Sequence, residues 1–198
     1  PLINEIAEVQ ATRVLLDECL EELHREGIPV PDSYSLGAMV ETPAAAMSAA
    51  ELARHVDFFS IGTNDLVQYT LAVDRGNSRL SKLYNPFHPG VVRLIRSIVD
   101  AGRAADIEVG VCGELAAHPL GAFMLVGMGV HSLSVGPSAL AEIKKVIRST
   151  SADAAREAVR EALAAGTPGE VVEALTRHAR DWIDLTRFSA AWSLSASA

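Results

Sequence analysis

Short apolar segments that alternate with helical segments restrict the fold of this chain more than any other feature. The segments predicted to be strands are 34–40, 57–61, 108–111 and 132–135. The segments predicted to be helices are 5–26, 44–54, 66–73, 89–105, 119–127, 139–148, 152–164 and 169–185. Strands and helices in alternation are typical of a parallel sheet with helical crossovers. We therefore predict an α/β fold.

Three of these strands are followed directly by residues that could bind a ligand or take part in a reaction. Glu41 follows the first strand, Asn64 and Asp65 follow the second, and Cys112 follows the third. In α/β barrels the carboxyl ends of the strands carry the active site. An open doubly wound sheet also binds ligands there, but no Gly-x-Gly-x-x-Gly motif follows the first strand. The pattern favours a barrel with its site at this edge.

The two carboxylates, Glu41 and Asp65, form a candidate metal site. Adjacent parallel strands lie about 4.8 Å apart, so both side chains can reach one cation. Two carboxylate ligands suit Mg²⁺, which usually keeps several waters and binds substrate oxygens. Each residue also has a simpler interpretation: Glu41 as a helix-capping or ion-paired group, and Asp65 as an acid at a helix N-terminus.

Arg75 and Cys112 are the other candidates, and each has an ordinary alternative. Arg75 follows Asp74 in a polar connection, where its planar guanidinium suits a phosphoryl group but where surface arginines are common. Asp74 either orients it or caps the turn. Cys112 lies between glycines that allow close approach of a ligand, yet a cysteine after an apolar strand is often only a small buried side chain. Cys19, among helical leucines, is expected to be structural.

The composition and net charge of the chain argue against several classes of function. The net charge of −8 argues against nucleic-acid binding, because no basic stripe is available to replace counterions. With 198 residues, 49% of them hydrophobic, the chain can bury a sizeable core. No apolar stretch approaches the roughly 18 residues of a membrane span. Two cysteines in unlike contexts do not suggest a disulfide framework, so a cytoplasmic location is expected.

The stretch Ser60-Ile61-Gly62-Thr63-Asn64-Asp65, continuing to Ala72-Val73-Asp74-Arg75-Gly76-Asn77, resembles the phosphoenolpyruvate-utilising enzymes, as does Val111-Cys112-Gly113-Glu114. Within that group the likeness is to enzyme I, the phosphoenolpyruvate-protein phosphotransferase of the bacterial sugar phosphotransferase system. The resemblance implies Mg²⁺, with Mn²⁺ as a substitute, held by Glu41 and Asp65. It implies substrate binding by Asn64, Asp65 and Arg75, and protonation of the enolate by Cys112 to give pyruvate.

The resemblance also sets expectations for organisation. Residues 1–185 resemble the C-terminal part of a phosphoenolpyruvate-binding (β/α)8 TIM-type barrel, with residues 1–3 ending its fourth strand, and 186–198 are expected to be a flexible tail. The phosphorylated histidine and the domain that docks the carrier protein HPr would lie outside this chain. The chain alone is therefore expected to be inactive in phosphotransfer, and to be a homodimer.

Two alternatives remain open from the sequence. Pyruvate phosphate dikinase and phosphoenolpyruvate synthase share the barrel and closely similar motifs, although Gln68 to Asn77 and Leu83-Tyr84-Asn85-Pro86 look more like enzyme I. The chain could also be a catalytically inert fragment that only self-associates. Binding of phosphoenolpyruvate with Mg²⁺ separates this last possibility from the others.

Overall fold

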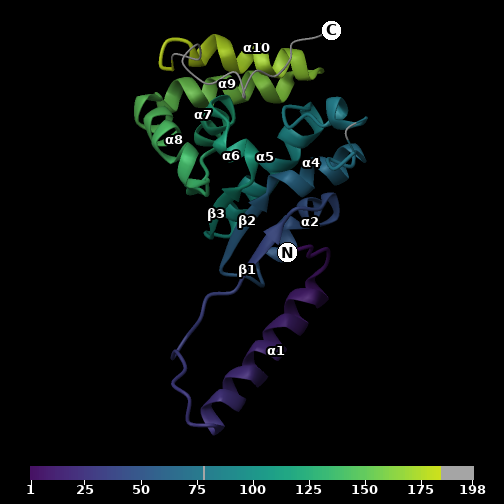
Figure 1. The fold of residues 1–198 in the computed structure, drawn as a ribbon, viewed down its shortest axis with the longest axis vertical. Helices are drawn as coiled ribbons and strands as arrows, with labels where there is room; N and C mark the ends of the chain where they lie inside the picture. The colour runs from purple at the N-terminus through teal and green to yellow at the C-terminus, as the bar shows by residue number, and fades with distance from the viewer. Residues whose placement is uncertain (78, 184–198) are drawn as a thin grey trace.

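The computed structural model describes residues 1–77 and 79–183 (Figure 1). Its strands are β1 (Gly37–Val40), β2 (Phe58–Gly62), β3 (Glu108–Cys112) and β4 (Ser132–Leu133). Its longer helices are α1 (Ile6–Arg25), α4 (Thr63–Leu71), α5 (Pro89–Ala104), α7 (Pro119–Met128), α8 (Pro137–Ser149), α9 (Ala152–Ala164) and α10 (Pro168–Ala179). The short ones are α2 (Pro43–Met47), α3 (Ala49–Leu52), α6 (Glu114–Ala117) and the 3₁₀ turn η1 (Ser81–Leu83).

The four strands form one parallel sheet in the order β1-β2-β3-β4, so each strand pairs with the next one along the chain. A helical connection follows each of the first three strands and returns the chain to the same edge. This arrangement confirms the predicted α/β class with a parallel sheet. All four carboxyl ends point the same way, which gathers the polar residues behind them at one edge.

Proline and hydroxyl residues fix where several helices begin. Thr42 accepts a hydrogen bond from the backbone N–H of Ala45 at 3.2 Å, with Pro43 at the first helical position, as expected for a helix start. The predicted 44–54 helix is divided at Ser48 into α2 and α3. The predicted 132–135 strand is shorter, since its pairing with β3 is limited to Ser132 and Leu133.

The core lies between the sheet and helix α5 and continues between α7, α9 and α10. Helix α7 is apolar on all sides because α9 and α10 cover the face turned away from the sheet (Figure 1). Gly127 allows α7 and α9 to pack closely, since a Cβ there would lie 2.2 Å from the carbonyl oxygen of Ala155. Arg93 of α5 joins these layers by donating to the carbonyls of Leu163 at 3.2 Å and Ala165 at 2.7 Å.

Helix α1 extends away from this body (Figure 1). The predicted helix is present, but of its apolar side chains only Val9 is fully buried, and Val14 and Leu15 are 56% and 60% exposed. Cys19, which we expected to be structural, is exposed as well. In the described part of the chain, no helix combines the length and apolarity needed to cross a membrane.

Candidate functional site

The register of the sheet brings the predicted site residues of three strands to one level. Val40 pairs with Ile61, and Gly62 pairs with Cys112. Glu41 follows Val40, so it lies beside Gly62, and β2 separates it from Cys112 on β3. Neighbouring strands are about 4.8 Å apart. The carboxylate, the glycine and the thiol therefore form a row across the carboxyl edge of the sheet.

Glu41 is a buried carboxylate at one end of this row. Its residue is 4% exposed, and Oε1 accepts a hydrogen bond from the backbone N–H of Leu2 at 2.6 Å. The side chain lies over Gly62, where a Cβ would come within 2.5 Å of Oε2. Burial of a charged carboxylate is costly unless hydrogen bonds or a cation compensate it. The position suits a residue that receives a cation.

Asn64 and Asp65 lie in the first turn of α4, directly beyond Gly62. The Oδ1 atom of Asn64 accepts a hydrogen bond from the backbone N–H of Glu114 at 3.0 Å. Gly113, at φ +99°, leaves room for this contact, because a Cβ there would lie 2.9 Å from the same oxygen. With Oδ1 engaged, the Nδ2 group of Asn64 is the part of the amide that can donate to an anionic ligand.

Cys112 is half-buried, and its thiol has two partners on β2. The hydroxyl of Ser60 donates to Sγ at 3.7 Å, and the thiol donates to the carbonyl oxygen of Ile61 at 3.5 Å. Its backbone carbonyl accepts from the hydroxyl of Thr63 at 2.8 Å. The sequence analysis missed Ser60. Period-2 alternation along β2, which places Ser60 and Gly62 on the same face of the sheet, could have indicated it.

Arg75 is exposed on the connection between α4 and α5. Its backbone N–H donates to Oε1 of Gln68 at 3.2 Å, which ties the connection to α4. Asp74 caps the turn, because its Oδ1 accepts from the backbone N–H of Gly76 at 2.8 Å. Of the two roles open to Asp74 in the sequence, turn capping is the one that these contacts describe.

Tyr84 connects this loop with the strand ends. Its hydroxyl donates to the backbone carbonyl of Asn64 at 3.3 Å. Burial raises the pKa of Tyr84 to about 12, the charges of Glu114 and Asp65 add to the rise, and Arg75 opposes it. The phenol thus lies in the electrostatic field of Asp65 and Arg75. The sequence analysis used Tyr84 only as part of a motif.

The raised pKa of Tyr84 predicts a loss of stability at alkaline pH. Below pH 10 the tyrosine is protonated in both folded and unfolded chains, so its contribution is intact. Between pH 10 and about 12 the unfolded chain releases the proton first, and the free energy of unfolding falls. We expect Tyr84→Phe to weaken this fall in urea unfolding measured across that window. Tyr69→Phe, which alters an exposed tyrosine, should follow the unmodified chain, and identical profiles for all three proteins would contradict the assignment.

The side chains that could coordinate a metal at this edge suit a hard divalent cation, but they are few. Within residues 1–77 and 79–183, no group of three or more His, Cys, Asp or Glu side chains is gathered to hold a metal ion. The carboxylates Glu41 and Asp65, which follow adjacent strands, are compatible with Mg²⁺, which is often bound by one or two carboxylates while water and substrate oxygens complete the octahedron. The structure brings these two residues to the same edge and leaves metal binding as a prediction.

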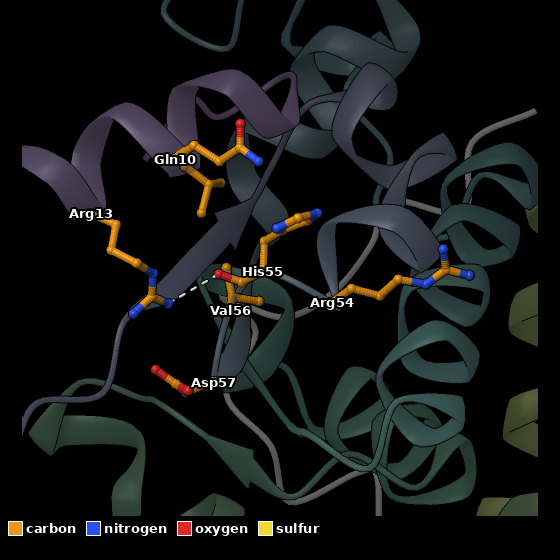
Figure 2. A pocket seen from close by; sticks show the side chains of 7 residues that line it. Gln10, Arg13, Arg54, His55, Val56 and Asp57 are labelled. Carbon is orange, nitrogen blue, oxygen red and sulfur yellow. Dashed lines mark hydrogen bonds between the residues drawn. The ribbon is translucent and has the colours of Figure 1, made fainter.

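A separate pocket lies at the opposite end of the sheet, between α1 and the amino end of β2 (Figure 2). Its volume is about 300 Å³, and its lining includes Gln10, Arg13, Arg54, His55 and Asp57. Arg13 donates to the carbonyl oxygen of His55 at 3.1 Å, whereas Arg54 points away from Arg13 (Figure 2). Its charged groups do not converge on one point, so the strand-end edge is the better candidate site.

Comparison with known protein families identifies the family of this chain. The sequence profile described as "PEP-utilising enzyme, PEP-binding domain" matches residues 1–152, where PEP stands for phosphoenolpyruvate. The chain belongs to the PEP-utilising enzymes. The parallel sheet and its helices are accordingly consistent with the C-terminal part of the TIM-type barrel of the PEP-utilising enzymes, as the resemblance implied.

Three relatives of this PEP-utilising chain carry the name phosphoenolpyruvate-protein phosphotransferase. The protein from Haemophilus influenzae is 43% identical over 171 residues, which is 86% of this chain and 30% of the relative. Those from Borreliella burgdorferi and Geobacillus stearothermophilus are 41% and 38% identical over 148 and 177 residues, covering 75% and 89% of this chain and 26% and 31% of each relative. The chain thus spans about a third of the length of these relatives.

Proposed function

We propose that this chain is the PEP-binding and enolate-protonating part of a phosphoenolpyruvate-protein phosphotransferase, enzyme I of the sugar phosphotransferase system. The observation that carries the proposal is the row at the carboxyl edge, where Glu41 lies beside Gly62 and Gly62 pairs with Cys112. The names of the relatives support the reaction class. In the complete protein, a histidine outside this chain would accept the phosphoryl group and pass it to HPr.

Each residue of the edge has a role in this proposal. Glu41 and Asp65 are the carboxylates that would hold Mg²⁺ or Mn²⁺. The bound cation supplies charge neutralisation for the phosphoryl group and for the enolate. Asn64 donates from Nδ2 to the substrate, and Asp65 also lies against it. The guanidinium of Arg75 offers a planar pair of N–H donors to two phosphoryl oxygens.

Cys112 completes the reaction by proton transfer. When the phosphoryl group has left, the S–H bond of Cys112 breaks and a C–H bond forms at the methylene carbon of the enolate, which becomes pyruvate. The sulfur keeps the electron pair of the S–H bond as a thiolate, and solvent water returns a proton to it. Ser60 lies at the sulfur and can donate a hydrogen bond to the thiolate.

Two alternative functions are less well supported than this proposal. Pyruvate phosphate dikinase and phosphoenolpyruvate synthase are the enzymes with closely similar motifs, but the names of the relatives favour the phosphotransferase. A purely self-associating fragment would have no use for a buried carboxylate and a half-buried thiol at the same edge of the sheet. Metal-dependent substrate binding distinguishes the proposal from this last alternative.

Isothermal titration of the 198-residue chain with PEP tests the proposal. We expect a heat of binding that depends on Mg²⁺ and that Arg75→Gln reduces, because the guanidinium is one of the groups offered to the phosphoryl oxygens. Arg54→Gln removes the same charge from an exposed position at the other end of the sheet and serves as the matched control. A heat that is the same with and without Mg²⁺, or no heat at all, would contradict the proposal.

We also propose that the chain forms a homodimer. The sheet ends at β1 and β4, and α1 exposes Val14 and Leu15 to solvent. Unpaired strand edges and exposed apolar surface favour association. Light scattering at micromolar concentration should give twice the mass of one chain, and Val14→Lys with Leu15→Lys should reduce association. A well-folded monomer for the unmodified chain would show that the proposal is wrong.

The remaining proposals concern organisation and location. We propose that residues 1–185 act as a single domain, supported by helices α9 and α10 packing on α7 beyond the matched range. The expected tail, 186–198, lies outside the described residues. We propose a cytoplasmic location, which Cys19 and Cys112 support because both are free thiols.

A further inference from the structure

A second, strongly basic pocket lies between α5, α7 and α9, and the proposed function makes no use of it. Its volume is about 500 Å³, within the range of small-molecule sites. Four arginines and one aspartate contribute the charges of its lining: Arg96, Arg103, Arg156, Arg160 and Asp100. These four arginines and one aspartate give the lining a net charge of +3, in a chain whose net charge is −8.

The pocket is remote from the candidate site along the helices. Helix α5 starts after the loop that carries Arg75 and ends before the amino end of β3, and α7 likewise ends before the amino end of β4. Arg103 and Gly129 lie at those late ends. A ligand of this pocket would therefore bind at the far side of the sheet from Glu41 and Cys112.

Two arginines on α5 face two arginines on α9. Arg96 and Arg103 are two turns apart on α5 and share one acidic partner: Asp100 lies 2.7 Å from Nε of Arg96 and 3.4 Å from Nη1 of Arg103. Arg156 and Arg160 are one turn apart on α9. A guanidinium has five N–H donors, so sharing one carboxylate leaves donors of both α5 arginines available to a ligand.

The arginines of α9 are the accessible pair. Their side chains are 63% and 70% exposed, and their partners are Asp153 and Glu157, each three residues earlier on the same helix. Neither acid contributes to the pocket lining. Arg156 and Arg160 can therefore donate hydrogen bonds to a ligand, because their acidic partners lie outside the pocket and do not compete with the ligand there.

Arg103 is held in place and gives the pocket a fixed charge. Its Nη2 donates to the carbonyl oxygen of Met128 at 3.0 Å. Gly129, at φ +83°, leaves space for the guanidinium, because a Cβ there would lie 2.7 Å from Nη2. A side chain already ordered by such contacts loses less conformational entropy when a ligand binds.

The rest of the lining is apolar. Val126 and Leu163 are half-buried and offer apolar surface to the pocket, whereas Val159, also in the lining, is buried. A lone phosphate would leave most of a 500 Å³ pocket and its apolar wall unused. The combination suits an organic group against Val126 and Leu163 and two phosphoryl groups among the arginines, whose planar forks match phosphoryl oxygens.

We propose that the pocket between α5, α7 and α9 is a binding site for a small organic diphosphate, of the class of a nucleoside diphosphate. The phosphoryl groups lie between Arg96 and Arg103 on one side and Arg156 and Arg160 on the other. The organic group lies against Val126 and Leu163. Asp100 competes with the ligand for the two arginines of α5.

Titration of the 198-residue chain with ADP, pyrophosphate and adenosine tests this site. We expect ADP to bind, pyrophosphate to bind more weakly and adenosine not to bind. Arg156→Gln combined with Arg160→Gln should weaken ADP binding by about tenfold or more, as expected when charge-assisted hydrogen bonds are lost. Arg25→Gln combined with Arg54→Gln removes the same charge from exposed positions elsewhere and should leave the affinity unchanged.

Asp100 provides a test with the opposite sign. Asp100→Asn removes the competing carboxylate, so we expect ADP to bind several-fold more tightly, as Coulomb attraction to the arginines increases. Glu173→Gln, which removes a carboxylate paired with Arg177 outside the pocket, is the control. Circular dichroism melting of each variant verifies that it is folded.

The results separate this inference from the proposed function. Glu41→Gln and Arg75→Gln should leave ADP binding unchanged, because both residues belong to the other edge of the sheet. Absence of ADP binding to the unmodified chain would overturn the inference. Equal affinity for ADP and adenosine, or the same affinity in the Arg156 and Arg160 variant, would also overturn it, whatever the outcome of the PEP titration.

Discussion

Replacing Cys112 by alanine in a complete phosphotransferase that carries this sequence should stop pyruvate formation while leaving PEP binding almost intact. The thiol is half-buried at the carboxyl end of β3, in hydrogen-bond contact with Ser60 and Ile61. In the proposed mechanism it acts only after the phosphoryl group has left. A general acid contributes roughly 10²–10⁴-fold to a rate, so we expect pyruvate production to fall by about this factor.

The measurement separates the two half-reactions. Rapid-quench detection of phosphorylated histidine should show that Cys112→Ala still accepts one phosphoryl group, whereas an assay for pyruvate shows little product. A mutation that removes a later step leaves earlier binding unchanged. Cys19→Ser, which alters an exposed thiol on α1, is the matched control and should behave as the unmodified enzyme. Normal pyruvate production by Cys112→Ala would remove this residue from the mechanism.

The sequence was sufficient to predict the class of fold and the edge that holds the candidate site. Alternating strands and helices imply a parallel sheet, and a parallel sheet places Glu41, Asn64 and Cys112 at one edge whatever the details of packing. The register adds what spacing cannot determine. It shows that Gly62, and not a side chain, separates Glu41 from Cys112 in the row.

The supporting residues could not be predicted, because their roles depend on contacts between distant segments. The hydrogen bond from Ser60 to Cys112 spans 52 positions, and the contact of Asn64 with Glu114 spans 50. The exposure of Val14 and Leu15 could not be predicted from the sequence either. The apolar periodicity of residues 5–26 correctly predicts a helix, but periodicity alone does not reveal whether the apolar side chains of that helix are covered.

Changing Glu41 to glutamine should abolish metal-dependent PEP binding without unfolding the chain. Glutamine keeps the shape of the side chain and an oxygen that can accept from the N–H of Leu2, but it lacks the charge that Mg²⁺ requires. The loss of an outer-shell partner already costs metal sites about 10–100-fold in affinity, so loss of a ligand should cost at least this much. Asp65→Asn should have the same effect, as measured by Mn²⁺ binding and by titration with PEP.

Stability provides an independent and opposite readout for Glu41. The carboxylate is 4% exposed, and burying its charge without a cation opposes folding. In the absence of divalent metal, Glu41→Gln should therefore melt at the same temperature as the unmodified chain or higher. With Mn²⁺ and PEP the order should reverse, because only the unmodified chain gains stability from binding.

The control and the structural test complete this prediction. Glu114→Gln removes an exposed carboxylate whose backbone, not its side chain, holds Asn64, so metal binding should be retained. In a crystal of the complex with PEP, the cation should lie about 2.0–2.2 Å from oxygens of both Glu41 and Asp65, as for Mg²⁺. A cation bound elsewhere, or unchanged Mn²⁺ affinity in both variants, would show that Glu41 and Asp65 do not hold the metal.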